Sequence, residues 1–492
     1  MGDRAVFRPV LRRWAPLIAV VAIGAILRFW RLGAPALIGD ESYYWLWSQR
    51  QDWAYFDHPA GIAILTWLST ALAGRAEAGV RWLNALLGLA CVPLIYALGL
   101  RMFSHTAGLL AATALAVGAP YLLTSRFVYT DALQLFLLLA SLCLFWRLVL
   151  ARPRPGVGTA LAFGLSLALL FNTKYSAYLF AAGLLLAVFI DHRRLLAEPR
   201  AWLAAAVGVL GLLPVLLWNA AHGWVSLRWQ LSHAGFSLAG QHSLLRAIHH
   251  SLGYLTWPLV LLALIGLGFV RRPAGRLVSL VALCMLLPVL LSPANSPRNL
   301  ANGLAALLLL AGACWPDSSQ RPRQRWLVAF LTLALSATAV YGLGTVASLS
   351  GPSPLPASSA VGDIRRDATG WRELGQALSA RRGPFYALDY SIASQIWFYA
   401  GQPAYTAWGQ YRIWGIPDVP SWTVVGLDYL PPEWVTERLS QAFGDVVGPD
   451  KLEYEDRGAN KVAYVWRCEG LVLDQAAFLR QFDFLVLLEA AP

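Results

Sequence analysis

The sequence predicts a mainly α-helical, polytopic membrane protein that ends in a small α/β domain. Of the 492 residues, 58% are hydrophobic and 13% are charged, and the mean hydropathy is +0.53, which lies outside the range of ordinary soluble domains. Apolar stretches of about 15 to 20 residues recur through the first part of the chain, and this is the length that a helix needs to cross the bilayer core. Basic residues gather in every second connection between them, as the positive-inside rule predicts for a chain with several spans.

About eleven such stretches are expected to span the membrane. The formal net charge of +12 does not indicate a nucleic-acid partner, because the Arg residues lie mainly in short loops between apolar runs. Arg28 and Arg31 follow the first stretch without a small-residue cleavage site, so we expect a retained first span rather than a removed signal peptide. The predicted spans start near Trp14, Val80, Thr106, Leu133, Val157, Ala177, Ala201, Leu252, Leu277, Leu300 and Trp326.

The Arg distribution places the N-terminus in the cytoplasm and the alternate loops outside. With an odd number of spans, the C-terminus also lies outside. The expected outer loops are residues 31–79, 125–132, 172–176, 218–251 and 292–299. In the first of these, residues 41–48 and 61–73 are aromatic or apolar but too short to span, so they are expected to lie as helices in the membrane interface.

Three parts follow from this pattern: a membrane domain over residues 1–347, a Ser- and Pro-rich linker over 348–359, and an outer α/β domain over 360–492. In the outer domain, residues 371–380, 392–399 and 432–443 have helical spacing. Residues 385–388, 422–425 and 462–466 are strand-like.

Two carboxylates, Asp40 and Glu41, directly follow the first span. Adjacent acids at a lipid interface are costly unless they are paired or used. One of them could accept a proton from an acceptor hydroxyl or amine as a general base. The alternative is that they cap and charge the first turn of the interfacial helix.

A second set of polar residues lies in the same outer region. Asp57 and His58 precede Pro59 and could form an ordinary helix entry, or the imidazole could contact a phosphate. Arg126 and Asp131 flank the turn before the fourth span, where Asp131 is either a helix-start residue or part of a charged cluster.

Lys174 is the sharpest single signal. The other two lysines of the chain, Lys451 and Lys461, lie in the predicted outer domain, so the membrane part uses Arg everywhere else. A compact ammonium on the outer side suits a phosphate ligand, and the alternative is snorkelling to lipid headgroups.

Together the outer loops bring carboxylates and cations to a similar depth, which suggests a site for an anionic, membrane-borne substrate. Glycine-rich nucleotide loops, a GxSxG elbow and HExxH are missing from the sequence, which disfavours nucleotide-driven and hydrolytic enzymes. The carboxylates are Asp40, Glu41, Asp57 and Asp131, and the cations are Arg126, Lys174 and Arg298.

Residues 39–44 (Gly-Asp-Glu-Ser-Tyr-Tyr) and 52–59 (Asp-Trp-Ala-Tyr-Phe-Asp-His-Pro) closely resemble the first outer loop of bacterial lipid-linked-sugar glycosyltransferases. These belong to the dolichyl-phosphate-mannose protein mannosyltransferase superfamily, which includes the lipid A aminoarabinose transferase. Residues 130–132, 173–175, 218–224 and 390–399 are also similar to family patterns. The chain departs from relatives at Ala60, where a second Pro is common, and at Asp57-His58, where the aminoarabinose branch has Glu-Lys.

The resemblance implies a GT-C fold and a polyprenyl-phosphate sugar as donor, with a lipid, glycan or protein acceptor at the periplasmic face of the bacterial inner membrane. It implies Asp40 as the catalytic base with Glu41 as its neighbour, and Lys174 near the donor phosphate. By mechanism we expect inversion at the anomeric carbon, with Arg126 or His58 helping Lys174 to stabilise the leaving phosphate. Supporting roles are expected for Asp57, Asp131, Tyr43, Tyr44 and Arg298, and no metal or other cofactor is expected.

Two other classes of function stay open on the sequence. A lipid or sugar transporter or flippase would use the same charges for binding without covalent chemistry, although charges at mid-span would favour it more. A non-catalytic scaffold would use the outer domain as a binding module.

Overall fold

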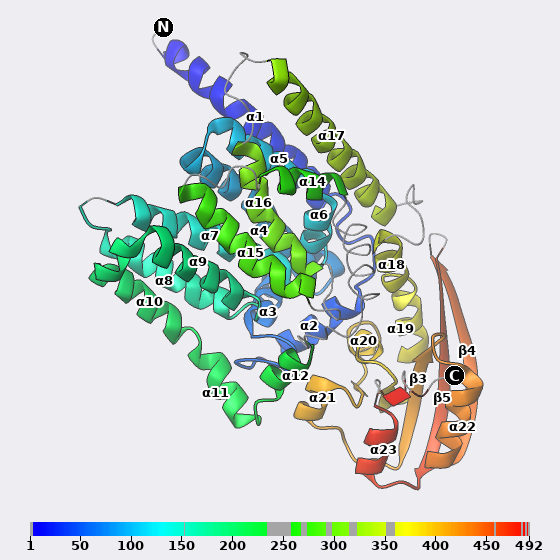
Figure 1. Ribbon diagram of the computed structural model, residues 1–492. Helices are drawn as coiled ribbons and strands as arrows, with labels where there is room; N and C mark the ends of the chain where they lie inside the picture. Colours follow the sequence, from blue (N-terminus) through cyan, green and yellow to red (C-terminus); the bar gives the residue numbers. More distant parts are fainter. Residues whose placement is uncertain are drawn as a thin grey trace.

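The computed structural model describes residues 3–151, 153–233, 257–266, 273–291, 298–313, 322–350, 360–456, 459–483, 486, 487 and 490. Most of these residues form helices that bundle together, and the chain from residue 360 onward gathers at one end of the bundle (Figure 1). Residues 351–359, most of the predicted linker, lie outside the described residues.

The bundle is built from apolar helices that pack through a large buried cluster of Leu, Ala, Val and Phe side chains. Its helices are α1 (Asp3–Phe29), α4 (Glu77–Met102), α5 (His105–Val117), α6 (Ala119–Arg126), α7 (Thr130–Leu150), α8 (Val157–Phe171), α9 (Ala177–Asp191), α10 (Pro199–Leu210), α11 (Leu213–Ala221), α14 (Trp257–Gly266), α15 (Pro273–Leu291), α16 (Arg298–Ala313) and α17 (Pro322–Ser350). The shorter η1 (Arg193–Ala197) and α12 (Val225–His233) connect or flank them.

Within the described residues, four helical segments have the length and hydropathy needed to cross a bilayer, and a fifth is added if α5 and α6, bent by 57°, form one broken span. Six further apolar helices are shorter, between 10 and 17 residues. Each predicted span that lies in described residues coincides with a helix, but the count of eleven stays a prediction. The segment from Leu252 is described only in part.

The first outer loop contains two short helices, α2 (Gly39–Gln49) and α3 (Gly61–Ala73), where interfacial helices are expected. Nine of the eleven α2 residues are buried, because α2 lies between the bundle and the C-terminal region. In contrast, α3 leaves Ile64, Trp67 and Leu72 more than half exposed, which is the apolar surface that an interfacial helix turns toward lipid.

The C-terminal region is a mixed five-stranded sheet with helices around it. The strand order is β2-β1-β3-β5-β4, with β1 parallel to β2 and β3, and β5 antiparallel to β3 and β4. The strands are β1 (Phe385–Ala387), β2 (Ala404–Tyr405), β3 (Ser421–Leu427), β4 (Phe443–Asp456) and β5 (Ala459–Leu471). The helices are α18 (Ala360–Asp367), α19 (Trp371–Ser379), α20 (Tyr390–Gln395), the π-helical turn η3 (Ile396–Ala400), α21 (Gly409–Trp414), α22 (Pro432–Ala442) and α23 (Gln475–Gln481).

The predicted helices and strands of this region are confirmed. The edge strands β2 and β4 and the helices α18, α21 and α23 were not predicted from the sequence. This C-terminal region and the first outer loop share one hydrophobic core. Trp47 and Tyr55 from the loop pack in the same buried cluster as Trp371, Ile392 and Val425. The C-terminal region is therefore docked directly on α2, through α20 and η3 (Figure 1).

Candidate active site

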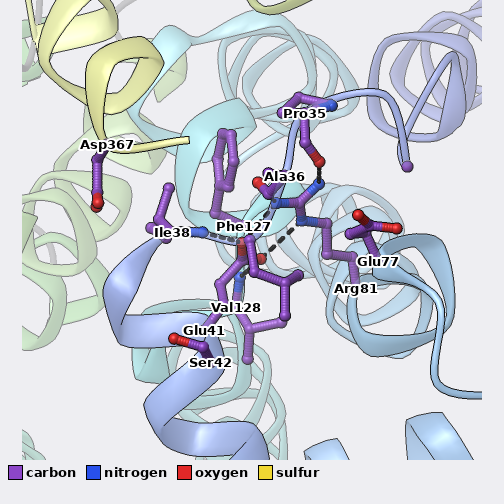
Figure 2. Close-up of polar contacts among 12 residues, drawn as sticks. Pro35, Ala36, Ile38, Glu41, Ser42, Glu77, Arg81, Phe127, Val128 and Asp367 are labelled. Atoms are coloured by element: carbon purple, nitrogen blue, oxygen red, sulfur yellow. Dashed lines mark hydrogen bonds and ion pairs between the residues drawn. The ribbon is translucent and has the colours of Figure 1, made fainter. Parts of the chain in front are cut away.

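Glu41 is locked into a buried ion pair at the start of α2 (Figure 2). Its Oε1 accepts hydrogen bonds from Arg81 Nε at 2.8 Å and from the Val128 amide at 2.9 Å. Its Oε2 accepts from Arg81 Nη2 at 2.5 Å and from the Ile38 amide at 3.0 Å. With four donors on two oxygens and no exposed surface, this carboxylate anchors α2 and has no free position for a substrate proton.

Asp40 is the other member of the pair and remains partly exposed. The Tyr390 hydroxyl, at the start of α20, donates to Asp40 Oδ1 at 3.0 Å. The negative charge of Asp40, followed by burial, raises the pKa of Tyr390 well above its usual value. Asp40 also lies in the first turn of α2, where the helix dipole favours an anion.

The C-terminal region also contacts the start of α2 through Asp367. Its carboxylate accepts from the Gly39 amide at 3.3 Å, next to Asp40 in the chain. Burial raises the pKa of Asp367 to about 6, while Lys461 lowers it and Asp40 raises it. A Cβ added at Gly39 would come within 2.4 Å of the Ser391 Cβ, so only a glycine permits this approach between α2 and α20.

Asp57 lies in the turn before α3, and hydrogen bonds from two other parts of the chain hold this turn in place. The Phe56 amide donates to Gln410 Oε1 at 2.8 Å, and Gln230 Nε2 donates to the Asp57 carbonyl at 2.8 Å. Burial raises the pKa of the Asp57 carboxyl to about 7; the nearby Tyr43 hydroxyl opposes the rise and the charge of Asp40 adds to it. Asp40 and Asp57 are thus electrostatically coupled, as neighbouring carboxylates in one site are.

Aromatic rings line the space between these acids. Tyr43 lies 4.9 Å from Tyr390 and 6.0 Å from Tyr411 between ring centroids, and Tyr44 lies 6.2 Å from His58. The predicted residues Asp40, Tyr43, Tyr44, Asp57 and His58 therefore meet around one face of α2. Their rings restrict water access beside the carboxylates.

Lys174 pairs with Asp131 at 3.0 Å, and their side chains are 13% and 4% exposed. Among the described residues, Asp131 is the hydrogen-bond partner of the Lys174 ammonium, so two of its three N–H donors are available. The Lys174 turn is joined to the Asp57 loop, because the Gly61 amide donates to the Asn172 carbonyl at 2.8 Å. A Cβ at Gly61 would meet that carbonyl oxygen at 2.5 Å, so the close approach depends on glycine.

Arg126 has a different environment from the one expected. Its guanidinium donates to the carbonyls of Leu27, Arg28 and Trp30 at 2.6 to 3.1 Å, and 2% of the residue is exposed. This geometry ties α6 to the end of α1 and does not bring Arg126 into contact with Asp40 or Lys174. A part in binding the donor stays a prediction for Arg126, as does a catalytic part for Glu41. Arg298 begins α16, but its side chain lies outside the described set.

Several residues of the site were not singled out in the sequence. Arg81 is a buried residue of α4. Asp367 and Gln410 lie more than 300 positions along the chain from Gly39 and Phe56, to which they are hydrogen-bonded. The only local signal was the 390–399 segment, which contains Tyr390. Within the described residues, no group of three or more His, Cys, Asp or Glu side chains is arranged to hold a metal ion; metal independence stays a prediction.

Residues 57–218 match the family model described as dolichyl-phosphate-mannose-protein mannosyltransferase. This range contains Asp57, His58, Asp131 and Lys174. The fold extends the likeness to almost the whole chain: ArnT from Cupriavidus metallidurans, solved in the apo state and bound to undecaprenyl phosphate, superposes with a TM-score of 0.61 in both states. The apo structure is 15% identical and the match covers 91% of this chain and 97% of that one.

The chain therefore has the GT-C fold of these neighbours. The archaeal oligosaccharyltransferase AglB from Archaeoglobus fulgidus is a more distant GT-C likeness, with a TM-score of 0.52 and 12% identity over 80% of this chain and 64% of that one. In sequence, the lipid A galacturonosyltransferase RgtD of Rhizobium johnstonii is 31% identical over 209 residues. That match covers 41% of this chain and 42% of the relative's length. With its apolar helices and this fold, the GT-C chain is an integral membrane protein.

Proposed function

We propose that this GT-C chain is a glycosyltransferase that moves a sugar from a polyprenyl-phosphate donor to an envelope acceptor, a lipid, glycan or protein. The contrast between the two adjacent acids is the observation that carries the proposal. Glu41 is saturated by four hydrogen-bond donors, whereas Asp40 keeps an exposed edge in the cluster with Tyr390 and Asp57. Glu41 therefore fixes the geometry and Asp40 is left for chemistry.

In the proposed reaction, the acceptor hydroxyl or amine attacks the anomeric carbon of the donor sugar. Asp40 takes the proton of the attacking group as a general base. The bond between the anomeric carbon and the phosphate oxygen breaks on the opposite side, so the configuration inverts. The electron pair of that bond leaves with the polyprenyl phosphate, which changes from a diester with one negative charge to a monoester with up to two.

Lys174 is proposed to receive this growing charge. Its pairing with Asp131 holds the ammonium in place and leaves two N–H donors for phosphate oxygens. His58 lies beside Tyr44, near Asp40 and Asp57, and is proposed to assist. Support for the lipid part of the donor comes from the structural comparison. ArnT, the GT-C neighbour, was solved with undecaprenyl phosphate.

The proposed location is the bacterial inner membrane, with the N-terminus in the cytoplasm and the C-terminal region in the periplasm. The alternation of basic connections supports this orientation. The site residues Asp40, Asp57 and Lys174 all belong to loops or helix starts on the side that this alternation assigns to the outside.

The test is sugar transfer by purified protein. Wild type, given a polyprenyl-phosphate sugar and a crude envelope acceptor, should release polyprenyl phosphate and form a glycosylated product. Asp40→Asn should lower kcat by about 10² to 10⁴ with the thermal midpoint unchanged, and Asp445→Asn, on exposed β4, should retain full activity. If Asp40→Asn keeps wild-type turnover, Asp40 is not the base. If wild type forms no product but moves the lipid-linked sugar across liposomes, the chain is a flippase.

A further inference from the structure

The segment that leads into Asp40 is hydrogen-bonded to the C-terminal region. The Leu37 amide donates to the Tyr399 hydroxyl at 2.8 Å, and Gln395 Nε2 donates to the Leu37 carbonyl at 2.7 Å. Leu37 and Gln395 are both buried, so water does not compete for these bonds. They tie the backbone three residues before Asp40 to α20 and η3.

Two further contacts hold the residue next to Asp40. The Gly39 amide donates to Asp367 at 3.3 Å. Gly39 also lies so close to α20 that an added Cβ would be 2.4 Å from the Ser391 Cβ. Such close packing leaves little room for movement between the starts of α2 and α20. The backbone of Asp40 is therefore placed by the part of the chain that carries Tyr390.

The Tyr390 side chain is itself fixed in position at the start of α20. Asp389 caps this helix, because its carboxylate accepts a hydrogen bond from the Ser391 amide. The Tyr390 ring packs against two other rings, with centroid distances of 4.9 Å to Tyr43 and 6.1 Å to Trp408. The cap and the two rings together fix the direction in which the Tyr390 hydroxyl points.

The Tyr390 hydroxyl can act on Asp40 only as a hydrogen-bond donor. The charge of Asp40, then burial, then the charges of Asp389 and Asp57 raise the pKa of Tyr390 well above its usual value, so the hydroxyl keeps its proton at neutral pH. A protonated phenol cannot replace Asp40 as the base. A carboxylate has two oxygens and about four lone-pair sites, so Asp40 can accept this donor and still take a proton from a substrate.

A donor at 3.0 Å from Asp40 Oδ1 serves a general base in two ways. The carboxyl group of an unrestrained Asp rotates over a broad range about its last torsion angle, and a fixed donor holds it in one orientation before the acceptor arrives. The same bond favours the charged form of the carboxylate, which is the form that can take a proton.

We propose that Tyr390 is a positioning residue for the base, and that the C-terminal region therefore supplies part of the transfer machinery. The inference rests on the proposed function, in which Asp40 takes the proton of the acceptor. Tyr390 acts through Asp40 and does not touch the sugar donor or the acceptor. Removal of its hydroxyl therefore slows the proton transfer without weakening the binding of either substrate.

The first test is the kinetics of Tyr390→Phe in purified full-length protein, with a polyprenyl-phosphate sugar and a crude envelope acceptor. The ring and its packing remain, and only the donor to Asp40 is lost. We expect kcat to fall roughly 10- to 100-fold, as for the loss of a hydrogen bond to a charged group, with both KM values unchanged.

The matched control is Tyr386→Phe. Tyr386 is also a buried tyrosine of the C-terminal region, and its hydroxyl donates to the Phe482 carbonyl at 2.9 Å. This bond lies in the hydrophobic core behind the sheet and not at Asp40. Tyr386→Phe should lower the thermal midpoint and keep the wild-type kcat.

A double-variant cycle separates positioning of Asp40 from direct contact with the substrate. Tyr390→Phe should lower the residual rate of Asp40→Asn by less than about twofold, because the effects of residues that act as a unit do not add. Losses that multiply would place Tyr390 in contact with the substrate and overturn the proposal. A wild-type kcat in Tyr390→Phe, or a rise in either KM with kcat unchanged, would overturn it as well.

A chemical measurement tests the positioning without catalysis. A carbodiimide reacts with the neutral form of a carboxyl group, and loss of a donor favours that form. Labelling of Asp40 with a carbodiimide and an amine, followed by peptide mass spectrometry, should be about tenfold faster in Tyr390→Phe than in wild type or Tyr386→Phe. Equal labelling rates would overturn the proposal.

The two measurements distinguish this inference from the proposed function. If wild type transfers no sugar, the proposed function is refuted, and the labelling rate still decides whether Tyr390 holds Asp40. If wild type is active and Asp40→Asn is not, a Tyr390→Phe variant with wild-type kinetics refutes the positioning role alone.

Discussion

Replacing Glu41 by Gln separates an anchoring role from a catalytic one. The substitution keeps the shape of the side chain but removes its charge and places an amide NH₂ against the Arg81 guanidinium. Arg81 then keeps its bonds to the carbonyls of Leu32, Pro35 and Ala36 at 2.7 to 3.0 Å but loses its counter-charge in a site where Arg81 is 1% exposed.

Breaking one side of a buried pair costs about 3–5 kcal/mol, because the remaining charge stays desolvated. For a chain of this size we expect an apparent thermal midpoint lower by roughly 3–5 °C. The assay is tryptophan fluorescence or size-exclusion recovery after heating of the detergent-purified protein. Glu437→Gln, on the exposed side of α22, should shift the midpoint by less than about 1 °C.

The double variant Glu41→Leu with Arg81→Met should not recover the loss, because it leaves buried backbone groups without partners: the carbonyls of Leu32, Pro35 and Ala36 and the amides of Ile38 and Val128. An outcome in which Glu41→Gln melts like wild type but has lost sugar transfer would refute the reasoning, because Glu41 would then act on the substrate directly.

Three further predictions concern the loops around Asp40. Asp57 has its pKa raised to about 7, so the folded protein keeps a proton that the unfolded chain loses above its usual pKa of 3.8. The contribution of Asp57 to stability is therefore present at low pH and lost as the pH rises toward 7, by as much as about 4 kcal/mol over that window. Asp57→Asn should flatten the dependence of the thermal midpoint on pH between pH 5 and 8. An unchanged slope would contradict a raised pKa of Asp57. Gly61→Ala should force α3 away from the Asn172 carbonyl, which should cost about 1–3 kcal/mol of stability and reduce turnover. The control is Gly158→Ala, whose added Cβ has no atom within 4 Å; it should be neutral or stabilising in the same melting and transfer assays. Lys174→Gln should lower kcat/KM for the donor roughly 10- to 100-fold, the value of a charge-assisted contact of about 1.5–3 kcal/mol, with a lower kcat and an unchanged acceptor KM. A variant with wild-type kcat and an equal rise in both KM values would contradict a role of Lys174 at the leaving phosphate.

The membrane helices could be predicted from the sequence because their signal is local. An apolar run of sufficient length has few alternatives to a helix in lipid, and short runs such as residues 61–73 are told from spans by length. The same reasoning failed for β4, whose Gly448-Pro449 interruption and charged second half conceal the alternation of a strand. Its pairing with β5 is supplied by the fold and includes an irregularity between Val447 and Asp450.

For the site, the sequence identified which residues are unusual but not how each one is used. In the sequence, Asp40 and Glu41 are adjacent acids, and either could be the general base. The structure distinguishes them because Arg81, 40 positions away, pairs with Glu41. Tyr390 and Asp367 approach Asp40 only through docking of the C-terminal region. No local pattern can predict such contacts, because they depend on how two distant parts of the chain pack.

The Tyr390 hydroxyl reaches Asp40 across 350 positions of the chain. During synthesis Asp40 is made together with the first helix, whereas Tyr390 leaves the ribosome only after the helices of the bundle have been made. At about 5–20 residues per second this delay is on the order of half a minute. In a chain that is still being synthesised, Asp40 therefore lacks its partner Tyr390, and the candidate site is complete only after the C-terminal region has been made.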